Sequence, residues 1–338
     1  MTAPARKREL GRGERVLPGV WRLRLPLPWP GVPHCNAWAL AAGDGVVLVD
    51  TGMHEPGSFA QLERALTMVG LGIGDIRLLV CTHAHVDHCG EAASIVERTG
   101  CELWMHPDHA HLTAQLEDPE AALARRVEVA AQSGVPERPL REWANARRGQ
   151  SLGISGPLSP DRDLLPGVTI QTDVGLWDVH ETPGHAPSHV CLHQPGRRIL
   201  LSGDHLLGRV SLYFDHGWTP DPVGEFLASL DHADGLDARL ALSGHGRPFT
   251  DVRAHVEANR ALVRQRLHAV RVAVADGPVT AYELAPRVYG PAFNPETATW
   301  LFTKLLCYLT HLEVVGDVRR LHGEPERWTA LESPDADR

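Results

Sequence analysis

Short apolar runs that end at glycine, proline or charged residues recur along the first 250 residues and predict β-strands. We expect strands at 20–25, 35–41, 46–50, 78–82, 102–106, within 168–201, and at 239–242. Segments with helical periodicity separate them and predict helices at 57–69, 90–100, 119–133 and 222–233. A proline-rich stretch at 26–33 predicts a stiff loop between the first two strands. Strands that alternate with helices indicate an α/β protein.

Residues 107–165 interrupt this alternation. Several alanines favour the helix at 119–133, whereas many glycines and prolines predict an irregular chain at 136–166. A long connection inside a compact domain is typical of a lid or a binding loop. Its arginines could contact an anionic substrate or could lie on solvated helix faces: Arg125, Arg126, Arg147 and Arg148.

The pattern changes after residue 250. A long helical pattern at 252–275 stops at Gly277-Pro278, and Thr280 to Glu283 has the form of a capping box that opens a short helix. A further helix is expected at 296–312, with two short strands at 314–315 and 328–331. This order resembles a winged-helix module. We therefore divide the chain into a larger α/β domain at 1–250, with 107–165 as an insertion, and a smaller helical, winged-helix-like domain at 251–338.

Charge argues against nucleic acid as the main partner. The net charge is −9, and residues 251–338 hold eleven Lys or Arg against twelve Asp or Glu. The helix that would read DNA, 297–311, carries one base, Lys304, whereas five arginines lie on the long helix at 252–275. These features favour a packing or dimerisation role for the tail, so a homodimer is one arrangement to test. They do not exclude a local basic groove.

The composition indicates in which cellular compartment the protein resides. The chain has 338 residues, of which 43% are hydrophobic, and no apolar stretch approaches the roughly 18–20 residues needed to cross a bilayer. Residues 1–15 are basic but lack a following apolar segment, so we expect a frayed tail. Six cysteines form no CxxC pair, which favours reduced thiols and a cytoplasmic protein.

Potential metal ligands are most concentrated in one hexad, His83-Ala84-His85-Val86-Asp87-His88, directly after the apolar run at 78–81. Histidine is the commonest metal ligand in proteins, and zinc accepts imidazole nitrogen and carboxylate oxygen. In extended chain, residues two apart such as His83 and His85 lie on the same side. Asp87 and His88 then follow on a turn. This geometry suits two adjacent metal ions better than one.

Three later strand-like runs each lead into a possible partner. The run near 177–181 precedes His185, the run at 198–201 precedes Asp204, and the run at 239–242 precedes His245. Glycine or proline lies beside each of these residues and favours a turn. Strand ends at one edge of a sheet can bring their side chains to a single site. A chance cluster is the alternative in a chain with 20 histidines, but the ordered set argues against it.

The chain thereby resembles the metallo-β-lactamase fold superfamily, whose pattern is HxHxDH followed by a lone His, a lone Asp and a final His. The resemblance implies an αβ/βα sandwich with the small winged-helix-like domain appended. It also implies two metal ions, the first held by His83, His85 and His185. The second would be held by Asp87, His88 and His245, with Asp204 bridging the two. Asp50 would orient ligating imidazoles.

The resemblance further implies hydrolysis. Two divalent ions, zinc by default and manganese or iron as alternatives, would bridge a hydroxide that attacks the substrate, with Asp87 orienting it. The first hypothesis is an ester or thioester hydrolase similar to the glyoxalase II group, acting on a small anionic acyl compound. The alternative is a single-stranded RNA phosphodiesterase similar to the lactamase-like endoribonucleases. The expected substrate contacts are Trp29, Tyr213, Phe214, Arg147 and Arg148.

Overall fold

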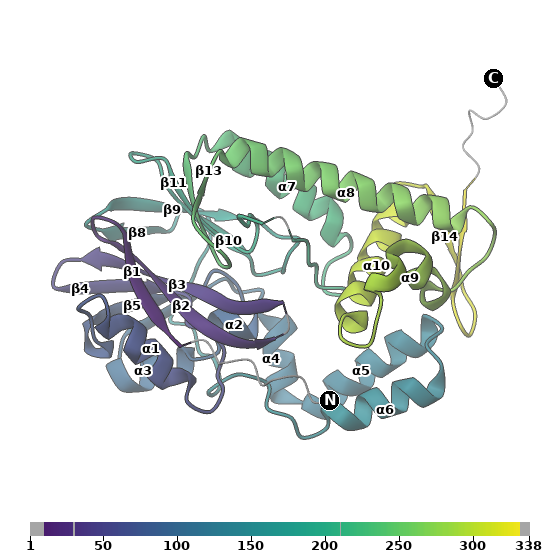
Figure 1. Cartoon of the computed structure of the whole chain (residues 1–338), viewed down its shortest axis with the longest axis horizontal. Coiled ribbons are helices and arrows are strands. Elements are labelled where there is room, and N and C mark those ends of the chain that lie inside the picture. Colours follow the sequence, from purple (N-terminus) through teal and green to yellow (C-terminus); the bar gives the residue numbers. More distant parts are fainter. Residues whose placement is uncertain (1–9, 30, 210, 332–338) are drawn as a thin grey trace.

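Two β-sheets stacked face to face form the centre of the computed structural model (Figure 1), which describes residues 10–29, 31–209 and 211–331. The first sheet holds seven strands in chain order, β1 to β7, and the second holds six in the order β13-β12-β11-β10-β9-β8. The first sheet comprises β1 (Arg12–Leu17), β2 (Val20–Trp29), β3 (Val32–Ala42), β4 (Gly45–Val49), β5 (Ile76–Val80), β6 (Glu102–Met105) and β7 (Arg162–Asp163). The second comprises β8 (Thr169–Thr172), β9 (Gly175–Glu181), β10 (Val190–Gln194), β11 (Ile199–Gly203), β12 (Leu240–Ser243) and β13 (Phe249–Thr250).

Helices cover the outer faces of the two sheets, so the αβ/βα sandwich expected from the sequence is confirmed. Apolar residues of β2 to β6 pack against α1 (Ser58–Thr67) and α3 (Ala92–Thr99), and a second apolar layer fills the space between the sheets. A third layer joins the second sheet to α7 (Pro222–Gly235). A short 3-10 helix, Ile73–Asp75, leads into β5, and α2 (Val86–Cys89) follows it.

The first 29 residues depart from the sequence prediction in two places. The expected frayed tail at 1–15 instead includes strand β1, which pairs antiparallel with β2; residues 1–9 lie outside the described part of the chain. The expected stiff loop at 26–33 instead extends β2 and β3 into a long hairpin, in which Pro26 faces His34 and Trp29 faces Val32. Since β1 pairs with β2 only as far as Arg24, Pro26 and Pro28 lie on a free edge of β2 where no donor is needed.

The segment 107–165 is a helical insertion rather than a largely irregular one. It contains α4 (Ala110–Glu117), α5 (Pro119–Gln132) and α6 (Glu137–Arg147). The expected irregular stretch at 136–166 was therefore wrong over α6, where Leu140 and Ala144 are buried one helical turn apart. The prolines and glycines that suggested a loop lie mainly before and after this helix.

The tail contains three helices and a hairpin in the expected order. They are α8 (Val252–Val274), α9 (Ala281–Tyr289), α10 (Ala298–Val314), β14 (Val318–Leu321) and β15 (Arg327–Ala330), with a short 3-10 helix at Gly290–Ala292. The predicted capping box at Thr280 and Glu283 is present. The strand expected at 314–315 is wrong, because α10 runs to Val314 and the strand begins four residues later.

The tail packs on the rest of the chain through two surfaces. Its helices share one apolar layer with α7 and with Leu200 of β11. It also meets the insertion, where the backbone N–H of Tyr282 donates to the carbonyl of Ser133 at 3.1 Å. Trp143 of α6 donates from its indole to the hydroxyl of Thr299 at 3.3 Å. The insertion and the tail are therefore in contact, and α5 and α6 lie next to α9 and α10 (Figure 1).

Among the described residues, no helix is both long and apolar enough to cross a membrane. All six cysteines are buried as free thiols.

Candidate metal centre

The seven predicted ligands lie at strand ends that meet at one edge of the sandwich. His83 and His85 follow β5 of the first sheet, and α2 then carries Asp87 and His88. The remaining three come from the second sheet and follow β9, β11 and β12 in turn: His185, Asp204 and His245. These three strands run in one direction, since β9 and β11 are both antiparallel to β10 and β12 is parallel to β11.

In the first half of the centre three imidazoles face one another. His85 Nδ1 lies 3.0 Å from His185 Nε2, and the His83 ring centroid lies 4.7 Å from that of His85 and 4.9 Å from that of His185. The ligand atoms of the three lie within 4.8 Å of one another. Three imidazoles so placed can share one metal ion.

The second half combines carboxylates with imidazoles. His245 Nε2 lies 3.2 Å from Oδ2 of both Asp87 and Asp204, and His88 Nε2 lies 3.6 Å from Asp87 Oδ2. Asp204 also reaches the first half, with its Oδ2 3.8 Å from His185 Nε2. This carboxylate therefore faces both halves, as a bridging ligand must.

The site fits the metal ions that the ligand set implies. Within the described residues, His83 Nε2, His88 Nε2 and Asp204 Oδ1 are buried polar atoms without a hydrogen-bond partner. Buried polar atoms without partners are costly, and a bound cation would satisfy them. Gly244 leaves the space they need, because a Cβ there would lie 2.2 Å from Asp204 Oδ1 and 2.6 Å from His88 Cε1.

A buried carboxylate orients the second half. Asp50 Oδ2 accepts from His88 Nδ1 at 2.8 Å, and Asp50 Oδ1 accepts from the backbone N–H of Thr82 at the same distance. Asp50 has a positive φ of 64°, a conformation that aspartate tolerates better than most residues. His245 donates from Nδ1 to the carbonyl of His34 at 2.9 Å. Both imidazoles thus present Nε2 to the centre.

A second carboxylate, Asp215, orients the first half. Its Oδ2 accepts from His85 Nε2 at 2.9 Å and lies 3.1 Å from Nδ1 of His111. His111 in turn contacts the hydroxyl of Ser188 at 2.9 Å through Nε2. His85 therefore turns Nδ1 towards the metal position.

The other two imidazoles of the first half are held by neutral groups. His185 donates from Nδ1 to the carbonyl of Tyr213 at 3.2 Å. His83 Nδ1 lies 3.0 Å from the hydroxyl of Thr82, which is also held by Asp50. Hydrogen bonds of this kind fix both the ring and its tautomer.

Without metal, the two halves differ in how they bind protons. Burial opposes a charge on His88, but the carboxylates of Asp87, Asp204 and Asp50 outweigh it and raise its pKa to about 9. Burial lowers the pKa of His185 to about 4. A metal entering the second half must therefore displace a proton at neutral pH.

Asp50 was expected from the sequence, whereas Asp215 and His111 were not. Asp215 follows Tyr213 by two residues in an apolar loop, and His111 lies in the insertion, 26 residues beyond His85. Neither belongs to a recognisable motif. Other titratable residues lie close to each of them in the sequence, so the sequence does not single out either one.

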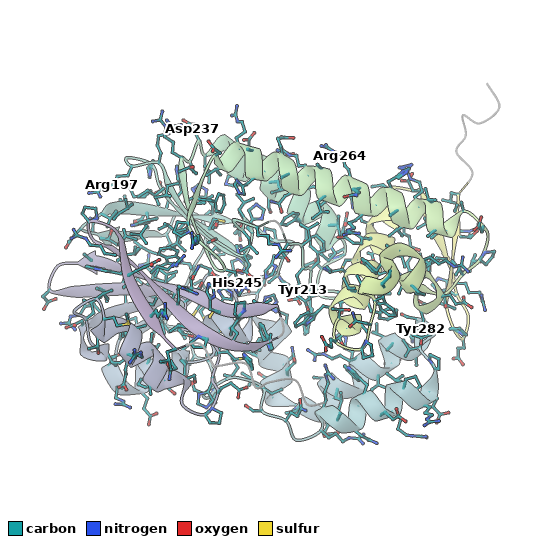
Figure 2. The ribbon with its side chains drawn as sticks, viewed as in Figure 1. Arg197, Tyr213, Asp237, His245, Arg264 and Tyr282 are labelled. Carbon is teal, nitrogen blue, oxygen red and sulfur yellow. The ribbon has the colours of Figure 1, made fainter. Side chains whose placement is uncertain are left out.

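The structure separates the two neighbouring residues Tyr213 and Phe214, both expected to contact substrate. The Tyr213 ring lies 5.7 Å from that of His85 and 5.8 Å from that of His185, beside the first half of the centre. Phe214 points the other way, is fully buried and packs against Phe226 at 5.3 Å. The expectation for Phe214 is corrected, because adjacent side chains in this extended loop face opposite sides. Figure 2 shows Tyr213 and His245 together in the central part of the molecule.

Trp29 ends β2 at the tip of the hairpin, where its ring meets that of Trp300 of α10 edge to face at 6.2 Å. The tip of the hairpin thus touches the tail. Arg147 stacks over Trp143 at 4.3 Å, and Arg148 pairs with Glu120 at 3.5 Å. These arginine contacts lie within the insertion, and neither of them includes a metal ligand.

The fold and the seven-ligand centre together define a metal-dependent hydrolase of the metallo-β-lactamase type. The chain belongs to the metallo-beta-lactamase superfamily, which matches residues 30–245. It is 26% identical to the probable metallo-hydrolase YqjP of Bacillus subtilis, over 82% of this chain and 86% of that protein. It is 26% identical to an atrochrysone carboxyl ACP thioesterase of Aspergillus chevalieri, over 50% of this chain and 57% of that one.

The fold is shared with solved structures of the superfamily along nearly the whole chain. A metallo-beta-lactamase family protein from Thermus thermophilus superposes with a TM-score of 0.80 at 28% identity, covering 94% of this chain and all of that one. A beta-lactamase domain protein from Burkholderia ambifaria superposes with a TM-score of 0.76 at 26% identity, covering 94% of each chain. The likeness therefore includes the insertion and most of the tail.

Proposed function

We propose that the protein hydrolyses an ester or thioester bond of a small, anionic acyl compound, with two divalent metal ions, zinc by default. The observation that carries the proposal is the intact ligand set, whose imidazoles are already oriented by Asp50 and Asp215. Two bound divalent ions supply a water of lowered pKa and polarise a carbonyl oxygen. This chemistry suits acyl transfer to water.

The chain's own residues have distinct roles in this proposal. Asp87 lies between His88 and His245 and would accept a hydrogen bond from the attacking water. Tyr213 would place the substrate beside the first half, since burial raises the pKa of its phenol and keeps the hydroxyl protonated. Trp29 and Trp300 would border the entrance at the tip of the hairpin.

A relative supports the acyl substrate class. The Aspergillus chevalieri relative is named as a thioesterase of a carboxyl compound on a carrier protein. Half of the present chain aligns with it, so the likeness supports the reaction class and leaves the acyl group open.

RNA cleavage is less well supported. The basic residues that made the long helix α8 a candidate RNA surface are largely paired with carboxylates of the same molecule. Arg253 lies 3.1 Å from Asp234, Arg271 lies 3.5 Å from Asp317, and Arg260 pairs with Asp231. Pairing of this kind leaves less charge for a phosphate backbone.

The test is a parallel assay of the zinc-loaded protein on acyl thioesters, lactones and single-stranded RNA. We expect thioester hydrolysis that is lost in Asp87→Ala and kept in Asp276→Ala, an exposed aspartate of the tail. Cleavage of RNA that depends on Asp87, with inert thioesters, would contradict the proposal. A cytoplasmic location and a homodimer belong to the same proposal and are checked by fractionation and by light scattering.

A further inference from the structure

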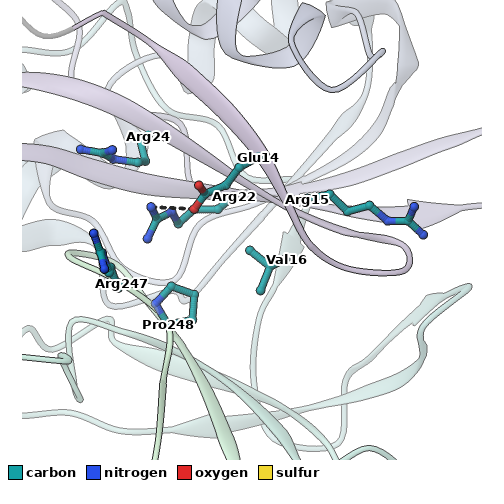
Figure 3. Close-up of a pocket in the computed structure, with 7 residues that line it drawn as sticks. All are labelled: Glu14, Arg15, Val16, Arg22, Arg24, Arg247 and Pro248. Atoms are coloured by element: carbon teal, nitrogen blue, oxygen red, sulfur yellow. Dashed lines mark ion pairs between the residues drawn. The ribbon is translucent and has the colours of Figure 1, made fainter.

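An open cavity of about 470 Å³ lies beside the second half of the metal centre, where β1 and β2 meet the loop after β12 (Figure 3). Its lining includes four arginines and a single carboxylate: Arg15, Arg22, Arg24, Arg247 and Glu14. Such a concentration of positive charge is unusual in a chain whose net charge is −9. None of its lining residues is one of the seven metal ligands.

Three of the guanidinium groups come together from two sheets. Arg22 and Arg24 are two residues apart on β2 and so share one face of the strand. Arg247 comes from the loop between β12 and β13 of the second sheet. Figure 3 shows these three side chains on one side of the cavity, with Arg15 directed away from them.

Arg22 is held in a fixed position. Its side chain is 5% exposed, one terminal nitrogen donates to the carbonyl of Gly246 at 2.9 Å, and the other pairs with Glu14 at 2.6 Å. Its Nε is buried and has no hydrogen-bond partner within the described residues. A buried guanidinium donor without a partner is costly, and an oxyanion in the cavity would satisfy it.

The guanidinium of Arg247 is available to a ligand. Arg247 is exposed, and no ion pair joins it to a carboxylate in the described part of the chain. Guanidinium groups bind carboxylate and phosphate through paired hydrogen bonds, and their planar shape favours these oxyanions over halide-like ions. Glu14 is the one lining carboxylate that offsets the arginines.

We propose that this cavity binds the carboxylate or phosphate group of an anionic ligand. The group belongs either to a free anion or to a substrate that also reaches the metals. The cavity is close to the centre, since Gly246 directly follows His245 and Arg24 lies 3.4 Å from the ring of His34. The carbonyl of His34 in turn accepts from His245. An anion bound in the cavity is therefore close to His245, a ligand of the second metal.

Calorimetric titration of the metal-loaded protein with inorganic phosphate tests the site. We expect Arg247→Glu to lower the affinity at least about tenfold, because it replaces a charged donor with a repelling carboxylate. Glu14→Gln should raise the affinity by about threefold, since it removes the opposing charge. Arg239→Gln, at an exposed arginine away from the cavity, should leave it unchanged.

Phosphate bound at the metals contributes equally in all four proteins, so the differences between them report the cavity. The proposal is wrong if Arg247→Glu binds phosphate as well as the wild type does, or if Glu14→Gln weakens binding. If the two residues had only a structural role, their substitution would not change the phosphate affinity in opposite directions.

A kinetic comparison then identifies the source of the oxyanion. If Arg247→Glu raises KM for a carboxylate-bearing acyl thioester and leaves KM for a neutral one unchanged, the group belongs to the substrate. If both KM values stay unchanged while phosphate binding is lost, a free anion is the ligand. This second experiment rests on the proposed thioester hydrolysis. The phosphate titration does not, so the two proposals fail separately.

Discussion

The two halves of the metal centre are built from different parts of the chain. The second half rests on Asp50 at the end of β4, which is fully buried and bonded to the adjacent strand end at Thr82. The first half rests on Asp215 and on the carbonyl of Tyr213, both in the loop between β11 and α7. One half is therefore fixed by the sheet, and the other depends on a loop that packs under the tail.

The halves also differ in charge. The second half contains the carboxylate of Asp87 beside its two imidazoles, whereas the first contains three imidazoles and borrows charge from Asp215 outside the ligand set. A carboxylate ligand attracts both metal ions and protons. The two metals should therefore respond differently to substitution and to pH, and the comparison can be tested one group at a time.

Asp204 is the residue that both halves share, so its loss should have the largest effect. We expect Asp204→Ala to reduce bound metal from two ions per chain to one or fewer and to lower kcat on the order of 10³-fold. Elemental analysis and steady-state kinetics measure the two effects, with Asp276→Ala as the control. Two ions retained in Asp204→Ala would show that the carboxylate does not bridge.

The pH dependence should separate the halves next. His88 and His245 both have a pKa raised above the ordinary value, once burial is outweighed by the neighbouring carboxylates, with His88 at about 9. In the first half, Asp215 likewise outweighs burial and raises the pKa of His85, while His185 stays neutral above about 4. Below pH 9 a metal entering the second half competes with more protons than one entering the first.

Affinity in the second half should therefore fall more steeply as pH falls, by up to about 100-fold per unit against about tenfold in the first half. Cobalt titrations followed by absorbance at pH 6, 7 and 8 measure both affinities. The raised pKa values also make the stability of the metal-free protein depend on pH. Since a raised pKa stabilises the fold below the unfolded value near 6.5, metal-free protein should lose thermal stability as pH rises from about 6.5 to 9. Equal slopes for the two metals would refute the contrast in charge.

Asp50→Asn tests the half that is fixed by the sheet. Asparagine tolerates the positive φ of this position and keeps one acceptor for Thr82, but it removes the charge that orients His88. We expect the second metal to bind about 10–100-fold more weakly while the first is retained. Competition with a chromophoric chelator measures the two affinities. A larger loss at the first metal would reverse the assignment of the halves.

Asp215→Asn is the matched test of the half that depends on the loop. The first metal should bind about 10–100-fold more weakly, because His85 loses its charged partner and His111 loses an ion-pair acceptor. The second metal should be unaffected. If both metals weaken together in both variants, the centre is a single cooperative unit and the distinction between its halves is wrong.

The sequence predicted the ligands better than it predicted what holds them. The seven predicted ligands follow strand ends in the order of the superfamily's pattern, so the resemblance identified them, and Asp50 ends a strand in the same way. Asp215 and His111 are brought to His85 by the packing of helix α4 against the loop between β11 and α7, which leaves no local pattern. The same limit explains why the expectation that Phe214 contacts substrate was wrong, since periodicity does not show which side of an irregular loop faces the core.

The fold was predictable to a similar degree. Alternating apolar runs predicted most of the strands and helices, because each element buries a face with its own period, whereas the sandwich arrangement was implied by the resemblance to the superfamily. The hairpin at 26–33 was missed because prolines usually end strands, and only the short length of β1 leaves them a free edge. Helix α6 was missed because its buried face is only a few residues wide.

The smallest expected effect concerns Tyr213, which bonds to Asp215 through its hydroxyl and lies against two ligand rings of the first half. Tyr213→Phe removes one donor from Asp215 but leaves those of His85 and His111. The first metal should therefore weaken by no more than about threefold, close to the lower end expected for one neutral hydrogen bond. The second metal should not change, and KM for a thioester substrate should rise by a similar factor if the hydroxyl contacts it. A loss as large as that of Asp215→Asn would mean that the phenol, rather than His111, holds Asp215 in place.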